Sequence, residues 1–171
     1  LAVDGAPQRQ GADLFQGFLY VVADYVTAKA HHYVDGATTY ITDVNCPNTA
    51  GVTKAASRIF APDGENIRYC AAGAARDWTT ASDAGFLPAG LQQDTKDDVT
   101  ACGTFQDALV VFWSESAQIW DVAVHPSANK IRKRIYGVGT IEPVSLAGFA
   151  NDLMFLSPFG FRSMVVQQTS D

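Results

Sequence analysis

The sequence lacks the long apolar runs and the cysteine patterns that identify several large classes of protein. No apolar run approaches the roughly 18 residues that a membrane-spanning helix requires. The three cysteines, Cys46, Cys70 and Cys102, are far apart and show no CxxC spacing. Isolated cysteines in odd number predict free thiols buried in a core, and they argue against a disulfide framework or a zinc site. The sequence therefore predicts no membrane partner, no metal site and no cofactor.

The sequence also lacks an excess of positive charge. It contains 12 Lys and Arg against 18 Asp and Glu, which gives a formal net charge of -6 at pH 7. Tight binding of nucleic acid depends on cations that displace the counterions of the phosphates. The charge balance therefore argues against a protein that holds nucleic acid on a broad basic face. With 47% hydrophobic residues in 171, the chain is predicted to be a single domain, residues 1–171, with a real core.

Signatures of common catalytic sites are missing as well. The sequence has no GxSxG element, and His31 and His32 show neither HxH nor HExxH spacing. Residues 137–142 begin like a phosphate-binding loop, but they lack its lysine and its helix, so a turn between strands is expected there. We therefore predict that the chain is not an enzyme.

The sequence does contain a succession of short apolar strands separated by turns. Residues 108–113 are six consecutive apolar residues, too few for a core helix and rich in β-branched and aromatic types. Residues 117–124 alternate between two faces, and residues 130–136 alternate with charge, as a protected outer strand does. Together these three segments predict an antiparallel meander.

The same pattern recurs along the chain. Hairpins are predicted within residues 18–42, 57–70 and 152–166, each with turn residues between apolar segments. Four apolar residues mark the repeat, with separations of 40, 50 and 44 residues: Leu19, Ile59, Leu109 and Leu153. A repeat of about 40 to 50 residues of strand and turn is the blade spacing of a β-propeller. The sequence thus predicts an all-β fold of antiparallel hairpin repeats, a partial β-propeller-type domain from a larger protein, and an all-β sandwich is the alternative.

Basic residues gather in one predicted strand. Four of the 12 cations lie within residues 130–134. By strand alternation Lys130, Arg132 and Arg134 face one way and form a narrow basic ridge. This ridge is a candidate contact for phosphates or for the carboxylates of a neighbouring subunit. A solvated edge strand that meets no partner is the alternative.

A series of short segments between Arg58 and Met164 resembles a known family. The segments are Arg58-Ile-Phe, Ile67-Arg-Tyr, Ala72-Gly-Ala-Ala-Arg-Asp-Trp78, Ala84-Gly-Phe86, Ala108-Leu-Val-Val-Phe, Gln118-Ile-Trp120, Pro126, Gly137-Val-Gly-Thr-Ile, Ser145, Asn151-Asp-Leu-Met-Phe-Leu-Ser and Gly160-Phe-Arg-Ser163. In order and spacing they resemble the tail nozzle and packaged-DNA-stabilisation family of short-tailed bacteriophages. This chain is much shorter than such proteins, which fits an isolated domain.

The resemblance implies a non-catalytic structural virion protein. Such a protein is located in the phage tail or neck and is produced in the cytoplasm of the bacterial host. It implies a ring made of copies of the chain, six-fold in related tails, that meets the portal or adaptor and other tail proteins. The ring continues the DNA channel, retains DNA before ejection and lets it pass without tight binding.

A glycan-binding or glycan-cleaving β-propeller domain is the alternative function. It requires acidic and aromatic side chains on one face. Glu115 and Asp121 are six residues apart across a turn and are candidates for a carboxylate pair. Trp78, Trp113 and Trp120 are expected in the core instead of on a sugar-stacking surface. A pocket lined by paired carboxylates and exposed tryptophans would favour this alternative.

Overall fold

The computed structural model describes residues 10–23, 32–35, 37–81, 83–93 and 96–169. His31 lies outside these ranges, and the side chain of His32 is not described either. In the described residues nearly all regular structure is β-strand, apart from the short helix α1 (Met164–Thr169) and three 3-10 turns. The predicted all-β class is therefore confirmed.

Four antiparallel sheets follow one another along the chain, and each is a meander of consecutive strands. Sheet 1 consists of β1 (Gln10–Phe15), β2 (Phe18–Ala23), β3 (His32–Asp35) and β4 (Ala37–Tyr40). Sheet 2 consists of β5 (Thr53–Ala55), β6 (Arg58–Asp63), β7 (Asn66–Tyr69) and β8 (Gly85–Leu87). Sheet 3 consists of β9 (Ala101–Phe105), β10 (Ala108–Phe112), β11 (Ser116–Asp121) and β12 (Lys130–Tyr136). Sheet 4 consists of β13 (Ala147–Phe149), β14 (Asp152–Ser157) and β15 (Gly160–Ser163). The 3-10 turns are η1 (Ala89–Gln92), η2 (Pro126–Ala128) and η3 (Pro143–Ser145).

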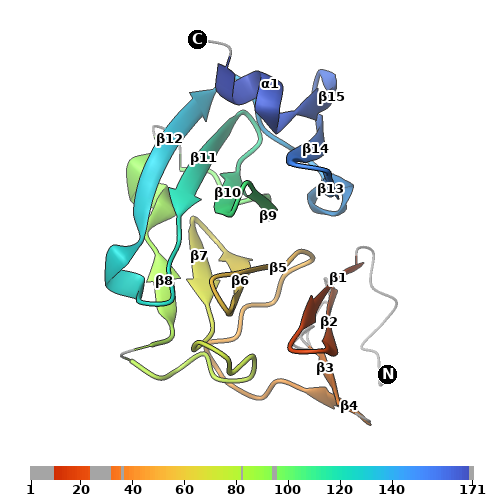
Figure 1. Ribbon diagram of the computed structural model, residues 1–171, viewed down its shortest axis with the longest axis vertical. Coiled ribbons are helices and arrows are strands. Elements are labelled where there is room, and N and C mark those ends of the chain that lie inside the picture. Colours follow the sequence, from red (N-terminus) through yellow and green to blue (C-terminus); the bar gives the residue numbers. More distant parts are fainter. Residues whose placement is uncertain (1–9, 24–31, 36, 82, 94–95, 170–171) are drawn as a thin grey trace.

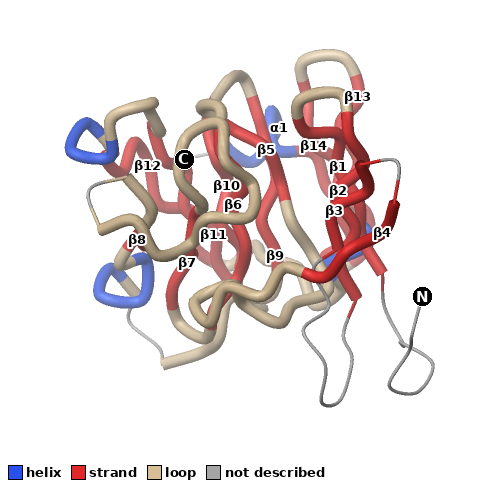
Figure 2. The backbone as a smooth tube through the Cα atoms, turned by 90° about the horizontal axis from the view of Figure 1, so that it is seen from below, coloured by secondary structure: helices blue, strands red, loops and turns tan. Residues whose placement is uncertain are grey.

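The sheets radiate from a common centre in an arc (Figure 1). The first strands β1, β5, β9 and β13 lie at the inside of the arc, and the last strands β4, β8, β12 and β15 lie at its periphery. Seen at right angles, the strands stand side by side with loops at both ends (Figure 2). The described sheets do not close into a ring, because the arc stays open between sheet 4 and sheet 1.

Three hydrophobic cores hold the successive sheets together. The first contains Phe15, Tyr20 and Val22 of sheet 1 with Ile59 and Ala61 of sheet 2. The second contains Phe60, Ile67 and Tyr69 of sheet 2 with Leu109, Val111 and Trp120 of sheet 3. The third contains Phe105, Val110, Phe112 and Ile119 of sheet 3 with Leu153 and Phe155 of sheet 4. The middle strands β6 and β10 are consequently buried on both faces, which explains their nearly continuous apolar sequences.

A two-residue turn joins the first two strands of every sheet. The turns are Gln16-Gly17, Ala56-Ser57, Gln106-Asp107 and Ala150-Asn151. In the first three turns both residues have positive φ, as in type I′ turns, and Ala150 has positive φ in the fourth. The residues that mark the predicted repeat, Leu19, Ile59, Leu109 and Leu153, all occupy the second position of the strand after this turn. The repeat seen in the sequence is therefore a repeat of hairpins.

The loop between β12 and β13 attaches sheet 4 to sheet 3. A Cβ atom at Gly139 would lie 2.1 Å from the Trp113 carbonyl oxygen, so only glycine fits there. The buried Thr140 donates its backbone N–H to the same oxygen at 2.9 Å, and its hydroxyl donates to the Leu156 carbonyl at 2.7 Å. The turn predicted at residues 137–142 is confirmed as a connecting loop.

Two parts of the predicted strand pattern were wrong. Residues 152–166 were predicted to be a hairpin throughout, but β15 ends at Ser163 and α1 begins at Met164, whose side chain is buried in the third core. The first strands of the sheets were not predicted as strands in their own right. Strands β5, β9 and β13 have only three to five residues, which is too short for a clear alternation of apolar and polar positions.

Candidate functional site

The predicted basic ridge lies on β12, the outermost strand of sheet 3 (Figure 1). Lys130, Arg132 and Arg134 are exposed there, and Ile131 between them is half-buried against the second core. An edge strand that carries cations resists pairing with other strands. Its charge is also accessible to a partner.

A β-bulge divides this ridge. Lys130 pairs with Asp121 of β11 and Arg134 pairs with Gln118, but the register shifts between Ile119 and Trp120. Asp121 and Gln118 are three residues apart and therefore point to opposite faces of β11. Lys130 and Arg134 consequently lie on opposite faces of the sheet. The prediction that all three cations face one way is corrected, because the extra residue of a bulge interrupts the alternation of side chains between the two faces of the strand.

Nearby acceptors engage each of the three cations. Asp121 forms an ion pair with Lys130 at 3.9 Å, and its carboxylate also accepts from Arg132 Nε at 2.7 Å. Arg134 donates to the side-chain oxygen of Gln92 in η1. These contacts reduce the charge that the ridge offers to a phosphate. The role of the ridge as a contact surface stays a prediction.

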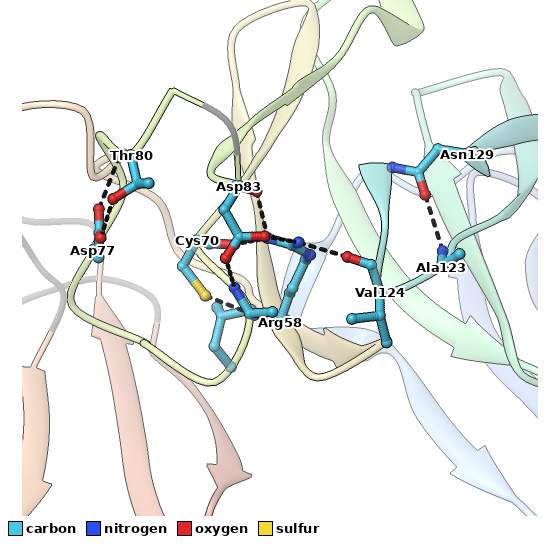
Figure 3. A network of polar contacts seen from close by, with 10 residues as sticks. Arg58, Cys70, Asp77, Thr80, Asp83, Ala123, Val124 and Asn129 are labelled. Atoms are coloured by element: carbon cyan, nitrogen blue, oxygen red, sulfur yellow. Dashed lines mark hydrogen bonds and ion pairs between the residues drawn. The ribbon is translucent and has the colours of Figure 1, made fainter. Parts of the chain in front are cut away.

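A second polar group, centred on Arg58, was not predicted from the sequence. Arg58 is only 1% exposed, and its guanidinium donates to the carbonyl oxygens of Cys70 at 2.8 Å and Val124 at 2.6 Å (Figure 3). It also donates to both the carboxylate and the carbonyl oxygen of Asp83, and it lies 5.3 Å from the centroid of the Tyr69 ring. One side chain thus joins β6, the segment after β7, and the loop after β11.

The electrostatics of this Arg58 network follow from its hydrogen bonds and burial. The Arg58 guanidinium and the Ala72 N–H donate to Asp83 and hold the pKa of its carboxyl below the ordinary value of 3.8. Burial raises the pKa of the Cys70 thiol to about 11, and the thiol sulfur accepts the Ile59 N–H at 3.1 Å. The Asp83 carboxyl is therefore ionised at neutral pH, and the Cys70 thiol stays protonated. The only signal in the sequence was an arginine directly before the apolar residues 59–62 of β6.

The cysteines and tryptophans occupy the positions that the sequence predicted. Cys46, Cys70 and Cys102 are all free and buried, and burial raises the pKa of the Cys102 thiol to about 12. The three tryptophans are at most 6% exposed and belong to the cores: Trp78 lies in the first core, and Trp113 and Trp120 lie in the second. Both predictions are confirmed.

Glu115 and Asp121 do not form a carboxylate pair. Glu115 lies in the turn before β11, and Asp121 is the last residue of that strand. A rise of about 3.3 Å per residue separates their backbones by about 20 Å. The suggestion that they approach each other is therefore wrong, because an extended strand lies between them.

A cavity lies among the hairpin turns of sheets 2, 3 and 4. Its volume is about 600 Å³, and its polar lining includes Lys54, Thr104, Asp107, Asn151 and Asp152. No tryptophan lines the cavity. The Asp152 carboxylate already accepts hydrogen bonds from the Ser163 hydroxyl and the Val165 N–H.

The protein-family models and the curated proteins give no relative from which to transfer a function. No protein-family model matches the chain, and no curated protein matches it. Across the part of the chain that the structure describes, no helix has the length and apolar character needed to cross a membrane. Function therefore has to be inferred from the chain's own residues and from the arrangement of its sheets.

Proposed function

We propose that the chain is a propeller-type assembly domain from the tail or neck of a short-tailed phage. It acts as a non-catalytic structural virion protein, a component of the nozzle or DNA-retention channel. The observation that carries the proposal is the repeat of antiparallel meander sheets, stacked face to face in an arc with their first strands inside. Stacked sheets of this kind are typical of propeller blades.

The resemblance between residues 58 and 164 and the nozzle family supplies the location and the partners. We propose that the domain stands in a ring of its own copies, six-fold as in related tails, below the portal or adaptor and beside other tail proteins. DNA passes through this ring without tight binding. The net charge of -6 supports the last point, because a polyanion is not retained by a predominantly acidic protein.

The absence of catalysis has separate support. All three tryptophans are buried, so none of them is available to stack on a sugar. The Cys70 and Cys102 thiols have raised pKa values and are poor nucleophiles. A glycan-binding or glycan-cleaving propeller is therefore less well supported, since it requires exposed aromatic residues beside paired carboxylates.

Purified phage particles test the proposal. Antibodies raised against the chain should label the tail end of intact particles in electron micrographs, and the chain should be detected in them by mass spectrometry. Particles assembled without the gene should lose packaged DNA. Particles that lack the chain but keep both tail and DNA would overturn the proposal, and labelling of the capsid surface alone would also contradict it.

A further inference from the structure

Both ends of the arc expose large apolar side chains on an outer sheet face. On sheet 1, Leu14 is 59% exposed and Leu19 is 42% exposed, and they pair directly across β1 and β2. On sheet 4, Phe149 of β13 is 75% exposed and Phe161 of β15 is 78% exposed. Leu156 pairs with Phe161 and lies on the same face. Large apolar side chains exposed on one sheet face are typical of an interaction site.

Equivalent positions in the four sheets show whether each exposed face points toward a preceding sheet or toward a following sheet. Ile59, Leu109 and Leu153, which are equivalent to Leu19, each lie in the core shared with the preceding sheet. Leu19 therefore faces the position of a preceding sheet. The next residue along each strand, Tyr20, Phe60 and Val110, lies in the core shared with the following sheet. Met154 is the equivalent residue of sheet 4, so the face that carries Met154 and Phe161 points to the position of a following sheet.

In each of the three cores, one sheet contributes the face equivalent to the outer face of sheet 4, and the next sheet contributes the face equivalent to the outer face of sheet 1. We propose that a second copy of this chain covers these two outer faces head to tail, with the outer face of sheet 4 of one copy packed on the outer face of sheet 1 of the next. Such a heterologous contact leads to a closed ring or to a filament. This proposal adds an interface to the proposed assembly function. It is based on the equivalent positions in the four sheets and does not depend on a phage origin.

The charge of the two faces suits this packing. The residues of β1 and β2 on the outer face of sheet 1, Ala12, Leu14, Leu19 and Val21, carry no charge. The outer face of sheet 4 contains Asp152, whose carboxylate is held by Ser163 and by the backbone N–H of Val165. These hydrogen bonds satisfy acceptor positions of the Asp152 carboxylate, so the contact has to cover one hydrogen-bonded carboxylate in an otherwise apolar pair of strand faces.

Sedimentation velocity over a concentration series tests the interface with the purified chain. The wild type should form species larger than the monomer as concentration rises. Leu19→Glu and Phe161→Glu should each weaken association by more than about tenfold, because each places a carboxylate in an apolar contact. Leu91→Glu, an exposed apolar residue on η1 outside both faces, is the matched control and should associate as the wild type does.

Mixing the two interface variants distinguishes head-to-tail pairing from other modes. Leu19→Glu keeps an intact sheet 4 face and Phe161→Glu keeps an intact sheet 1 face, so the mixture should form a dimer and nothing larger. A wild type that stays monomeric, or association that only one of the variants disrupts, would overturn the proposal. Hydrogen exchange of the wild type provides a check that needs no variant: β1, β2, β14 and β15 should become more protected at high concentration, and unchanged protection would contradict the interface. These experiments test the interface alone. Antibody labelling of phage particles tests the proposed location independently of them.

Discussion

Arg58 shows how one buried charged residue can connect elements that are far apart in the sequence. Its guanidinium meets the carbonyl oxygens of Cys70, Asp83 and Val124 together with the Asp83 carboxylate. The planar guanidinium presents several donors in fixed directions, which suits this set of acceptors better than an ammonium group does. Because Val124 lies in the loop between β11 and β12 of sheet 3 and Arg58 belongs to sheet 2, the contact also fixes the two neighbouring sheets.

Replacing Arg58 should therefore destabilise the whole fold. We expect Arg58→Ala to lower the free energy of unfolding by about 3 kcal/mol, since the buried Cys70 carbonyl and the partly buried acceptors lose their donor and the aliphatic part of the side chain loses its packing. Urea unfolding followed by tryptophan fluorescence measures this change. Lys96→Ala removes an exposed cation and should change the stability by less than about 0.5 kcal/mol. Equal effects of the two substitutions would contradict the role given to Arg58.

The same ion pair predicts a pH dependence. The hydrogen bond from Arg58 and that from the Ala72 N–H lower the pKa of Asp83 below its ordinary value of 3.8. A carboxyl whose pKa is lower in the folded state contributes stability that is fully present above its unfolded pKa. This contribution is lost as the pH falls through the lower folded value. Unfolding midpoints in urea should thus drop more steeply with acidification for the wild type than for Asp83→Asn, and parallel curves would exclude this contribution.

At the level of elements, the four hairpin turns explain what the sequence could and could not predict. The second strands of the sheets were found, because they are apolar and recur at a regular spacing. The first strands were missed since their turns, such as Ala56-Ser57 and Gln106-Asp107, lack the Asn-Gly or Asp-Gly signature of a type I′ turn. The bulge in β12 could not be predicted either, because charged and apolar residues still alternate in the sequence at the point where the pairing with β11 shifts.

The unusual turn residues offer a direct test. Ala56 and Ser57 adopt φ values of 46° and 59°, a conformation that costs an L-residue roughly 1 kcal/mol relative to glycine. The double substitution Ala56→Asn and Ser57→Gly should raise the free energy of unfolding by about 1 kcal/mol. Thermal or urea unfolding measures the gain. Ala147→Gly in β13 is the control and should destabilise slightly, since glycine weakens an extended strand.

At the scale of the whole molecule, the sequence predicted which residues are buried better than it predicted the polar contacts between them. The buried cysteines and tryptophans followed from residue type, since apolar groups gain most from burial wherever the chain places them. The Arg58 network and the hydrogen bond of Arg134 depend on contacts between residues that are distant in the sequence, such as Arg58 with Val124 and Arg134 with Gln92. Periodicity carries no information about such contacts.

The division of the ridge leads to the last prediction, which concerns DNA. Asp121 neutralises part of the charge of Lys130 and Arg132, and the protein as a whole carries a net charge of -6. Binding through so few cations falls steeply with salt, by about one power of the salt concentration for each phosphate neutralised. We therefore expect no duplex DNA binding in mobility-shift titrations at about 150 mM salt. Any binding at low salt should disappear when Lys130, Arg132 and Arg134 are all replaced by Ala. Submicromolar binding at physiological salt would instead indicate that the domain clamps DNA.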